Sequence, residues 1–388
     1  MAKESSLFRT LALGAVTAPN RLAFAPCTRH RSRIDGVPTD LNVEYYRQRA
    51  SAGLLITEGT APSAMGVGYL FTPGLYTEAH IRGWRKVTDA VHAEGGRIFC
   101  QLMHTGRLSD SLLLPEGATP IAPSAVQPDP TARHYTVNCP RPKREVPYPV
   151  PRAMTRADIQ KTVDEYAHAT RCALDAGFDG VELHAASGYL PMQFLSTNTN
   201  LRNDEYGGSV ANRCRFVVEC LEAMAAVNGP RFVAAKVSPG WTFHNVMDDD
   251  PQATYSHLAK EIAGKGYAYL QVGNYGMDWD VYGTMRQHFD GPIIAVGGFT
   301  RNTAVQMIDS GLADMVAFGQ AYIANPDLAE RFQDGSPINR PRVDTYYSQG
   351  AAGYTDYPRL QDANLEECMS PDEYPAPLTA SQDDRVDL

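Results

Sequence analysis

The sequence predicts a single (β/α)8 barrel, and three features support this fold class. Eight short segments are almost continuously apolar and are bounded by turn residues. Segments with helical spacing of apolar residues lie between most of them, and no internal repeat or second domain interrupts the alternation. Strands that are apolar on both faces belong to parallel sheets covered by helices, and eight such units favour a closed barrel over a doubly wound sheet. We assign residues 1–360 to this domain.

The alternation predicts the position of each element. The expected strands are Leu22–Ala25, Leu54–Thr57, Arg97–Leu102, Gly180–Leu183, Phe232–Val237, Tyr269–Val272, Ile293–Val296 and Met315–Phe318. The expected helices are Leu41–Ala52, Ile81–Glu94, Ala157–Ala176, Asn212–Asn228, Gln252–Gly264, Thr303–Ser310 and Asn325–Gln333. Thr155, followed three residues later by Asp158, is typical of a helix start, because the two side chains can bond free backbone N–H groups.

Two segments interrupt the alternation. Residues 105–152 are rich in proline and separate the third strand from its helix. Loops of this length are usually functional covers or lack fixed structure, and this one follows the carboxyl end of a strand, so we interpret it as a lid over the active face. Residues 7–19 precede the first strand, and we expect them to close the floor of the barrel.

The composition is that of an ordinary globular protein, with 43% hydrophobic and 20% charged residues. No stretch approaches the roughly 18 to 20 apolar residues that cross a bilayer, and the first ten residues lack the apolar core of a secretion signal. We therefore expect a cytoplasmic protein without a membrane partner. The seven cysteines form no CxxC pair and no cluster at zinc spacing, so we expect reduced thiols and no metal.

The formal net charge of −9 is concentrated at the C-terminal end. Residues 361–388 hold eight acidic residues and only Arg385 as a base, which we interpret as a solvated acidic tail. A nucleic-acid surface would need clustered Lys and Arg, so no nucleic-acid partner is expected. The oligomeric state is left open between a monomer and a homodimer.

Residues in and just after the strand ends should converge on one site, because barrel enzymes place their catalytic groups there. Most of these residues are polar or glycine. The set comprises Pro26, Cys27, Thr28, Glu58, Gly59, Gln101, Met103, His104, His184, Ser187, Tyr189, Lys236, Gln271, Asn274, Gly297, Gly298, Gly319 and Gln320.

The glycines after the last two strands suggest an anion site. Gly297 and Gly298 follow the seventh strand and Gly319 follows the eighth, which is the common phosphate site of barrel enzymes. The sequence contains no GxGxxG opening a βαβ unit, no GxxxxGK[ST], no HExxH and no GxSxG, which argues against a Rossmann site, a P-loop, a zincin and a hydrolase elbow. A flavin mononucleotide (FMN) fits these observations.

Several long motifs resemble the Old Yellow Enzyme family of FMN-dependent ene-reductases. They are APCTRHRS from Ala25, TEGT from Thr57, FCQLMHTGR from Phe99, HAASGYLPMQFL from His184, NxRxDxYGGS from Asn200, FGQAYIANPDL from Phe318 and GYTDYP from Gly353. The resemblance runs from about Leu7 to Pro358. It implies a barrel with bound FMN, a hydride taken from NADPH or NADH, and its delivery to the β-carbon of an activated alkene such as an enone or enal.

The resemblance also implies cofactor-binding roles. Thr28 resembles the hydroxyl that bonds flavin O4, with Pro26 beside it, and Gln101 resembles the amide at the pyrimidine edge. Gly59 would offer a backbone group to the ring. Lys236 stands where the family usually has an arginine beside N1 and O2, and a cation there would stabilise the charge of the reduced flavin.

On the substrate side, His184 resembles the donor to the substrate carbonyl, and Tyr189 resembles the acid that protonates the α-carbon. A phenol with a pKa near about 10 stays protonated at neutral pH and can donate. Met103, Phe243 and Tyr347 are expected to line the substrate site, with Met103 at a position often held by a bulky aromatic residue.

Two further departures from the family pattern keep other functions open. Ser187 replaces the Asn or His that forms the second donor to the carbonyl, which favours a redox-neutral or oxidative isomerase, cyclase or desaturase as an alternative. Gln320 replaces the arginine that bonds the phosphate, with the loss of a charge-assisted bidentate contact. This second change favours a flavin-free barrel that uses His184 and Tyr189 for acid–base chemistry or binding.

Overall fold

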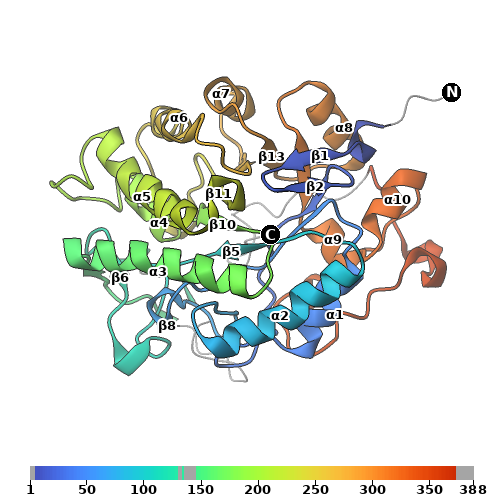
Figure 1. The fold of residues 1–388 in the computed structure, drawn as a ribbon, viewed down its shortest axis with the longest axis horizontal. Coiled ribbons are helices and arrows are strands. Elements are labelled where there is room, and N and C mark those ends of the chain that lie inside the picture. Colours follow the sequence, from blue (N-terminus) through green and yellow to red (C-terminus); the bar gives the residue numbers. More distant parts are fainter. Residues whose placement is uncertain (1–4, 130–132, 135–145, 373–388) are drawn as a thin grey trace.

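A computed structural model describes residues 5–129, 133–134 and 146–372, and it confirms the (β/α)8 barrel. Eight strands close into one barrel with hydrogen-bonded neighbours in chain order, and β5 pairs in parallel with β10 across the residue 105–152 segment. Figure 1 shows the helices packed around the strands. The barrel strands are β3 Leu22–Phe24, β4 Leu54–Ile56, β5 Ile98–Leu102, β10 Gly180–Ala185, β11 Val233–Val237, β12 Leu270–Gly273, β13 Ile293–Val296 and β14 Met315–Phe318.

The expected helices are present, with boundaries shifted by a few residues. Thr155 and Asp158 form the expected reciprocal cap at the start of α3, and Thr77 caps α2 by accepting a bond from the His80 N–H. The longer helices are α1 Asp40–Gln48, α2 Glu78–Ala93, α3 Arg156–Asp175, α5 Val210–Asn228, α6 Pro251–Ile262, α7 Val281–His288 and α8 Arg301–Asp309.

Two differences from the sequence prediction have local causes. The helix α7 was not expected, because its eight residues include Gly283 and few apolar side chains; the Asp280 carboxylate starts it by accepting from the Gly283 N–H. The expected helix Asn325–Gln333 begins three residues later, as α10 Leu328–Asp334, and a separate short helix, α9 Gln320–Ala324, precedes it. Pro326 disfavours helical geometry at the residue before it, and Asn325 has extended backbone angles.

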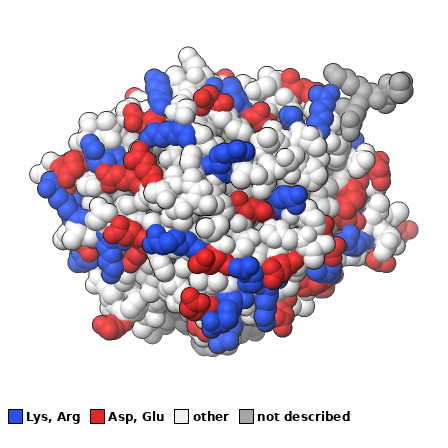
Figure 2. All heavy atoms as spheres, viewed as in Figure 1, with Lys and Arg blue, Asp and Glu red and all other residues white. Residues whose placement is uncertain are grey.

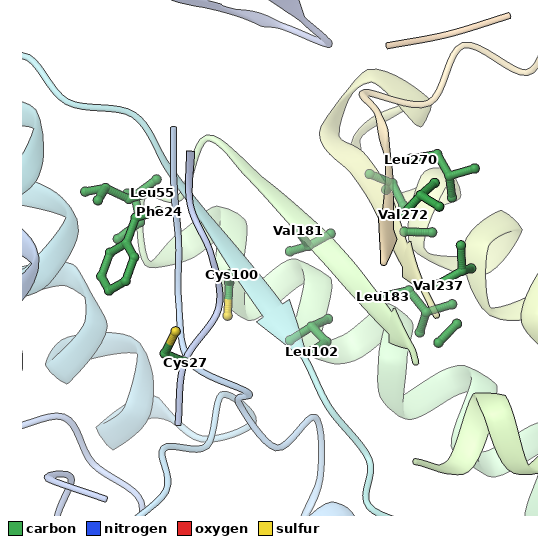
Figure 3. Packing of buried hydrophobic residues seen from close by; sticks show 14 of the residues in the cluster. Phe24, Cys27, Leu55, Cys100, Leu102, Val181, Leu183, Val237, Leu270 and Val272 are labelled. Atoms are coloured by element: carbon green, nitrogen blue, oxygen red, sulfur yellow. The ribbon is translucent and has the colours of Figure 1, made fainter. Parts of the chain in front are cut away.

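The barrel strands bury both of their faces, as the apolar runs predicted. Outward-facing side chains such as Leu102, Val181 and Leu183 pack in the large cluster between the strands and the helices, together with Cys27 and Cys100 (Figure 3). Inward-facing side chains fill the barrel itself in a second cluster. The cysteines of the first cluster are therefore small core residues.

An N-terminal hairpin closes one end of the barrel, as expected. Its strands β1 Leu11–Leu13 and β2 Val16–Ala18 pair antiparallel. Leu13 is fully buried in the same cluster as the inward-facing side chains of the barrel. The Arg231 guanidinium, just before β11, donates to the Gly14 carbonyl of the turn, so the hairpin covers the amino ends of the strands.

The segment between β5 and α3 contains four short strands, in which β6 Ile121–Ala122 pairs with β9 Arg152–Ala153 and β7 Arg133–His134 pairs with β8 Val146–Pro147. Two buried or half-buried arginines connect it to the barrel loops. Arg107 donates to the carbonyls of His244 and Asn245 after β11, at 2.8 Å each. Arg202 donates to the Pro123 carbonyl at 3.0 Å.

Part of the residue 361–388 segment runs along the barrel. Met369 and Ile338 exchange backbone hydrogen bonds, and the Asp372 carboxylate accepts from the Asn302 N–H at the start of α8. Residues 373–388, which hold much of the expected acidic tail, lie outside the described residues.

We predict that Leu13→Ala lowers the free energy of unfolding by about 2–5 kcal/mol, because it leaves a cavity in the floor of the barrel. Denaturant unfolding followed by circular dichroism measures the change. Thr17→Ala, at an exposed position of the same hairpin, serves as the control. Equal effects of the two substitutions would contradict the assignment of the hairpin to the core.

Candidate active site

Four adjacent strands place a layer of polar side chains inside the barrel, near the carboxyl ends of the strands. Gln101, Lys236 and Gln271 each lie two residues after an inward-facing residue of the inner cluster, so they face inward as well. Glu182 is in register with Gln101, and Lys236 is in register with both His184 and Gln271. All five side chains are buried.

Most polar atoms of this layer have no protein partner. The Gln101 amide donates from Nε2 to Glu182 Oε1 at 2.8 Å. The second Glu182 oxygen, His184 Nδ1 and both polar atoms of the Gln271 amide are buried without a hydrogen bond among the described residues. Lys236 likewise has no acceptor or ion pair there. Because unpaired buried polar groups are costly, this layer is suited to a ligand with a polar edge.

Burial changes the protonation of two of these groups. Burial raises the pKa of the Glu182 carboxyl to about 7, against the opposing effects of Lys236 and of the Gln101 hydrogen bond. Burial, together with the Lys236 charge, holds the pKa of His184 well below its usual value. The imidazole is therefore neutral at pH 7 and carries one N–H donor.

The ends of β3 and β4 form the adjacent wall of the site. Pro26 and Thr28 are buried after β3, and the Thr28 hydroxyl makes no hydrogen bond within the described residues. At Gly59 an added Cβ would lie only 2.4 Å from Met103 Sδ. A larger residue at this point would therefore force the Met103 side chain to move.

The glycines expected to bind a phosphate meet at the next two strand ends. Val296 and Ala317 are in register on β13 and β14, which places the residue 297–298 loop beside Gly319 and Gln320. Gly297 and Gly298 both have positive φ, a conformation that favours glycine. No hydrogen bond of the described residues uses the backbone N–H of Gly298 or Gly319, or the Gln320 side chain. These groups remain available to an anion.

Aromatic side chains from distant segments line the substrate side. The rings of His184 and Tyr189 lie 5.0 Å apart at a steep angle, and the hydroxyls of Tyr189 and Tyr69 are 3.1 Å apart. His30 contacts Tyr69 at 6.0 Å and Tyr347 at 5.2 Å between ring centroids. The expected residues His184, Tyr189 and Tyr347 therefore belong to one row of rings.

The remaining expected residues lie around this row. Ser187 is buried with φ of 55°, and its N–H donates to Ser238 Oγ at 3.0 Å. Met103 packs in one small cluster with Tyr189 and with Leu108 and Tyr148 of the residue 105–152 segment. Phe243 begins a short helical turn, Phe243–Asn245, after β11, and its side chain lies outside the described residues.

The C-terminal segment reaches the site through two buried arginines. Arg29 donates to the carbonyls of Tyr346 and Gly353, and Arg31 donates to those of Tyr346 and Thr345. These bonds fix the backbone on both sides of Tyr347. The position of this ring therefore depends on the loop after β3, more than 300 residues earlier in the chain.

Sequence reasoning missed Tyr69, His30 and Tyr148. Tyr69 lies well beyond the end of β4, and Tyr148 lies in the irregular segment before α3, so neither is marked by its distance from a strand end. His30 lies in the quoted APCTRHRS motif but was given no role. Its ring contacts to Tyr69 and Tyr347 depend on its positive φ of 57°, which the sequence does not reveal.

Metal sites, membrane-spanning helices and the distribution of surface charge can also indicate function. The described residues contain no group of three or more His, Cys, Asp or Glu side chains placed to hold a metal ion. Among the same residues, no helix has the length and apolar character needed to cross a bilayer. Positive and negative side chains are intermixed on the face shown in Figure 2. The absence of a nucleic-acid partner stays a prediction.

The barrel and its site define a class of protein. The amide, ammonium and imidazole groups of the polar layer suit the polar edge of an isoalloxazine ring. The free loop N–H groups after β13 and β14 suit a phosphate. Together they match the site of a flavin oxidoreductase built on a (β/α)8 barrel. The chain matches the family model described as NADH:flavin oxidoreductase / NADH oxidase over residues 6–339, and it belongs to that family.

Similar proteins agree with this assignment and with the Old Yellow Enzyme resemblance. A probable flavin mononucleotide-dependent alkene reductase of Leishmania infantum is 40% identical over 91% of this chain and 97% of its own. The 12-oxophytodienoate reductase 1 of Oryza sativa subsp. japonica is 37% identical over 91% of this chain and 93% of its own.

Solved structures give the same result. Morphinone reductase in complex with tetrahydroNAD has a TM-score of 0.88 and 43% identity, with 91% of this chain and 97% of that chain covered. An Old Yellow Enzyme homologue from Zymomonas mobilis has a TM-score of 0.87 and 39% identity, with 91% and 99% covered. The protein is an FMN enzyme that takes its electrons from a nicotinamide cofactor.

We predict that Gln320→Arg tightens FMN binding by about tenfold, because a charge-assisted bond to a phosphate is stronger than a neutral one. Titration of the apoprotein with FMN, followed by quenching of flavin fluorescence, measures the affinity. Gln320→Lys should gain less, since an ammonium lacks the planar fork of a guanidinium. Unchanged affinity in Gln320→Arg would show that backbone N–H groups already carry the phosphate.

Proposed function

We propose that the protein reduces the C=C bond of an α,β-unsaturated carbonyl compound, with Tyr189 as the proton donor. The observation that carries this proposal is the pairing of His184 and Tyr189, two buried rings 5.0 Å apart beside the unpaired polar layer. The named relatives include alkene and 12-oxophytodienoate reductases, whose substrates belong to this chemical class. Bound FMN supplies the hydride, which it receives from NADPH or NADH.

His184 binds and polarises the carbonyl of the substrate. Its neutral imidazole can donate one N–H to that oxygen, which withdraws electron density from the alkene and stabilises the enolate charge as it forms. Lys236, in register with His184, contributes a positive charge next to the site, and burial together with this charge lowers the pKa of the imidazole and keeps it neutral.

Tyr189 then gives its phenolic proton to the α-carbon. Its side chain is fully buried, and its hydroxyl lies 3.1 Å from that of Tyr69. A neighbouring hydroxyl at this distance can hold the phenol in a fixed orientation and return a proton to it afterwards. Two further side chains border the space for the substrate. They are Met103 and Tyr347, and the Tyr347 ring contacts His30, which in turn contacts Tyr69.

Contacts of Leu108 and Tyr148, two described residues of the residue 105–152 segment, support the interpretation of this segment as a lid; residues 130–132 and 135–145 lie outside the described residues. Leu108 and Tyr148 pack directly on Met103 and Tyr189. The Gln193 amide also joins the start of this segment to the loop after β10, because it donates to the carbonyls of Thr105 and Gly188. Such a cover would keep water away from the reacting atoms.

Ser187 favours a redox-neutral or oxidative reaction as the second candidate. A serine hydroxyl is shorter than an Asn or His side chain, so the carbonyl would keep one strong donor, His184. Weaker polarisation slows hydride addition and leaves room for isomerisation or desaturation. Since FMN is the cofactor, we set aside the flavin-free alternative.

We predict that Tyr189→Phe leaves reduction of the bound flavin by NADPH nearly unchanged and slows its reoxidation by an enone by about 10²-fold or more, because only the second step needs the proton. Anaerobic stopped-flow absorbance separates the two half-reactions. Tyr69→Phe, which keeps the acid and removes its neighbour, should slow reoxidation less. An equal loss in both half-reactions of Tyr189→Phe would refute the proton-donor role.

We also predict that Ser187→Asn speeds reoxidation by a simple cyclic enone. Asparagine tolerates the positive φ at this position better than most residues and adds a second N–H donor. The rate constant with the enone measures the gain, and Ser187→Ala controls for loss of the hydroxyl. No gain with an unchanged flavin spectrum would mean that Ser187 does not limit the reaction.

A further inference from the structure

We propose that Glu182 is a positioning residue of the flavin site, which fixes the Gln101 amide and, just above neutral pH, binds one solvent proton when the cofactor is reduced. This role rests on the FMN site of the proposed function and concerns a carboxyl that takes no part in the proton and hydride transfers to the substrate. It would make Glu182 the group that balances charge beneath the pyrimidine edge of the flavin.

The geometry ties Glu182 to a predicted flavin contact. Glu182 faces into the barrel from β10, is fully buried, and stands in register with Gln101 of β5. Its Oε1 accepts from Gln101 Nε2 at 2.8 Å, which fixes the amide orientation. The other amide hydrogen and Gln101 Oε1 are then left for the ligand.

The surroundings of Glu182 allow its charge to change. Its second oxygen, Oε2, has no hydrogen bond of normal geometry among the described residues, although the nearby Tyr269 phenol, Lys236 and Gln101 all oppose the rise of the carboxyl pKa that burial causes. The titratable groups around it are Lys236 on β11, His184 on its own strand and Tyr269 on β12. Burial and the carboxylate raise the pKa of the Tyr269 phenol, and His184 is neutral, so Lys236 is the only cation of the three.

These conditions couple Glu182 to the charge of the cofactor. Burial raises the carboxyl pKa to about 7, so both forms are populated near neutral pH. Hydride from NADPH or NADH would add two electrons and one proton to a bound flavin, and Lys236 would face the one negative charge that results. That charge raises the carboxyl pKa further, because a nearby negative charge disfavours the carboxylate. Glu182 then binds one proton from water and releases it on reoxidation.

Proton uptake by the holoenzyme tests the proposal. The oxidised enzyme is reduced anaerobically at an electrode, through a viologen mediator that carries electrons and no protons, in weakly buffered solution with a pH indicator, and protons bound per two electrons are counted between about pH 6 and pH 9. The expected count for the natural protein rises above one and toward two at pH values just above 7. The count increases because, in this pH range, the Glu182 carboxyl is ionised in the oxidised enzyme and protonated in the reduced enzyme.

The variants identify the group. Glu182→Gln keeps an acceptor for Gln101 and cannot titrate, so its count should stay at one throughout. Glu219→Gln is the control: burial also raises the pKa of the Glu219 carboxyl, but Glu219 lies on α5, outside the barrel, where it accepts from the Tyr206 hydroxyl. Its profile should match that of the natural protein.

Several outcomes would overturn the proposal. A count of one at every pH in the natural protein does so without any variant, which covers the case in which Glu182→Gln fails to fold. An excess that persists in Glu182→Gln would place the second proton elsewhere, for example on the flavin itself. Absence of bound FMN from the natural protein would instead refute the proposed function.

Discussion

The in-register pairing of eight parallel strands is the constraint on which the site depends. Side chains alternate between the two faces of a strand, so one register decides which residues of every strand face inward. The contact between β5 and β10 brings Gln101 beside Glu182, and that between β11 and β12 brings Lys236 beside Gln271. A slip of one residue in any of these pairs would turn a polar side chain into the apolar layer against the helices.

The closed sheet also explains why the core can contain a polar layer at all. Apolar residues fill the barrel toward the amino ends of the strands, where the N-terminal hairpin adds Leu13 and Ala18 to them. The polar groups lie nearer the carboxyl ends of the strands, where we propose that FMN satisfies them. In this proposed site, part of the cost of burying Lys236 and Gln271 is offset only when the cofactor is bound, which would link cofactor binding to the stability of the barrel mouth.

The sequence predicted the barrel strands well and the positions of residues in the long loops poorly. Lys236 and Gln101 could be assigned because each lies within a barrel strand whose apolar pattern fixes its place. Tyr69 and Tyr148 could not, because their positions depend on loops whose path is set by contacts with other loops. The helix α7 was missed for a related reason: Gly283 and a short apolar face weaken its periodicity, and packing on the neighbouring helix α6 compensates. Cytoplasmic location and the choice between monomer and homodimer stay predictions.

The N-terminal hairpin has a consequence for how ligands reach the site. Because it closes the barrel at the amino ends of the strands, a ligand of the polar layer has to enter and leave at the carboxyl ends. Leu108 and Tyr148, which pack on Met103 and Tyr189, lie on that side. The rate at which ligands exchange therefore depends on loops that contribute nothing to the barrel itself.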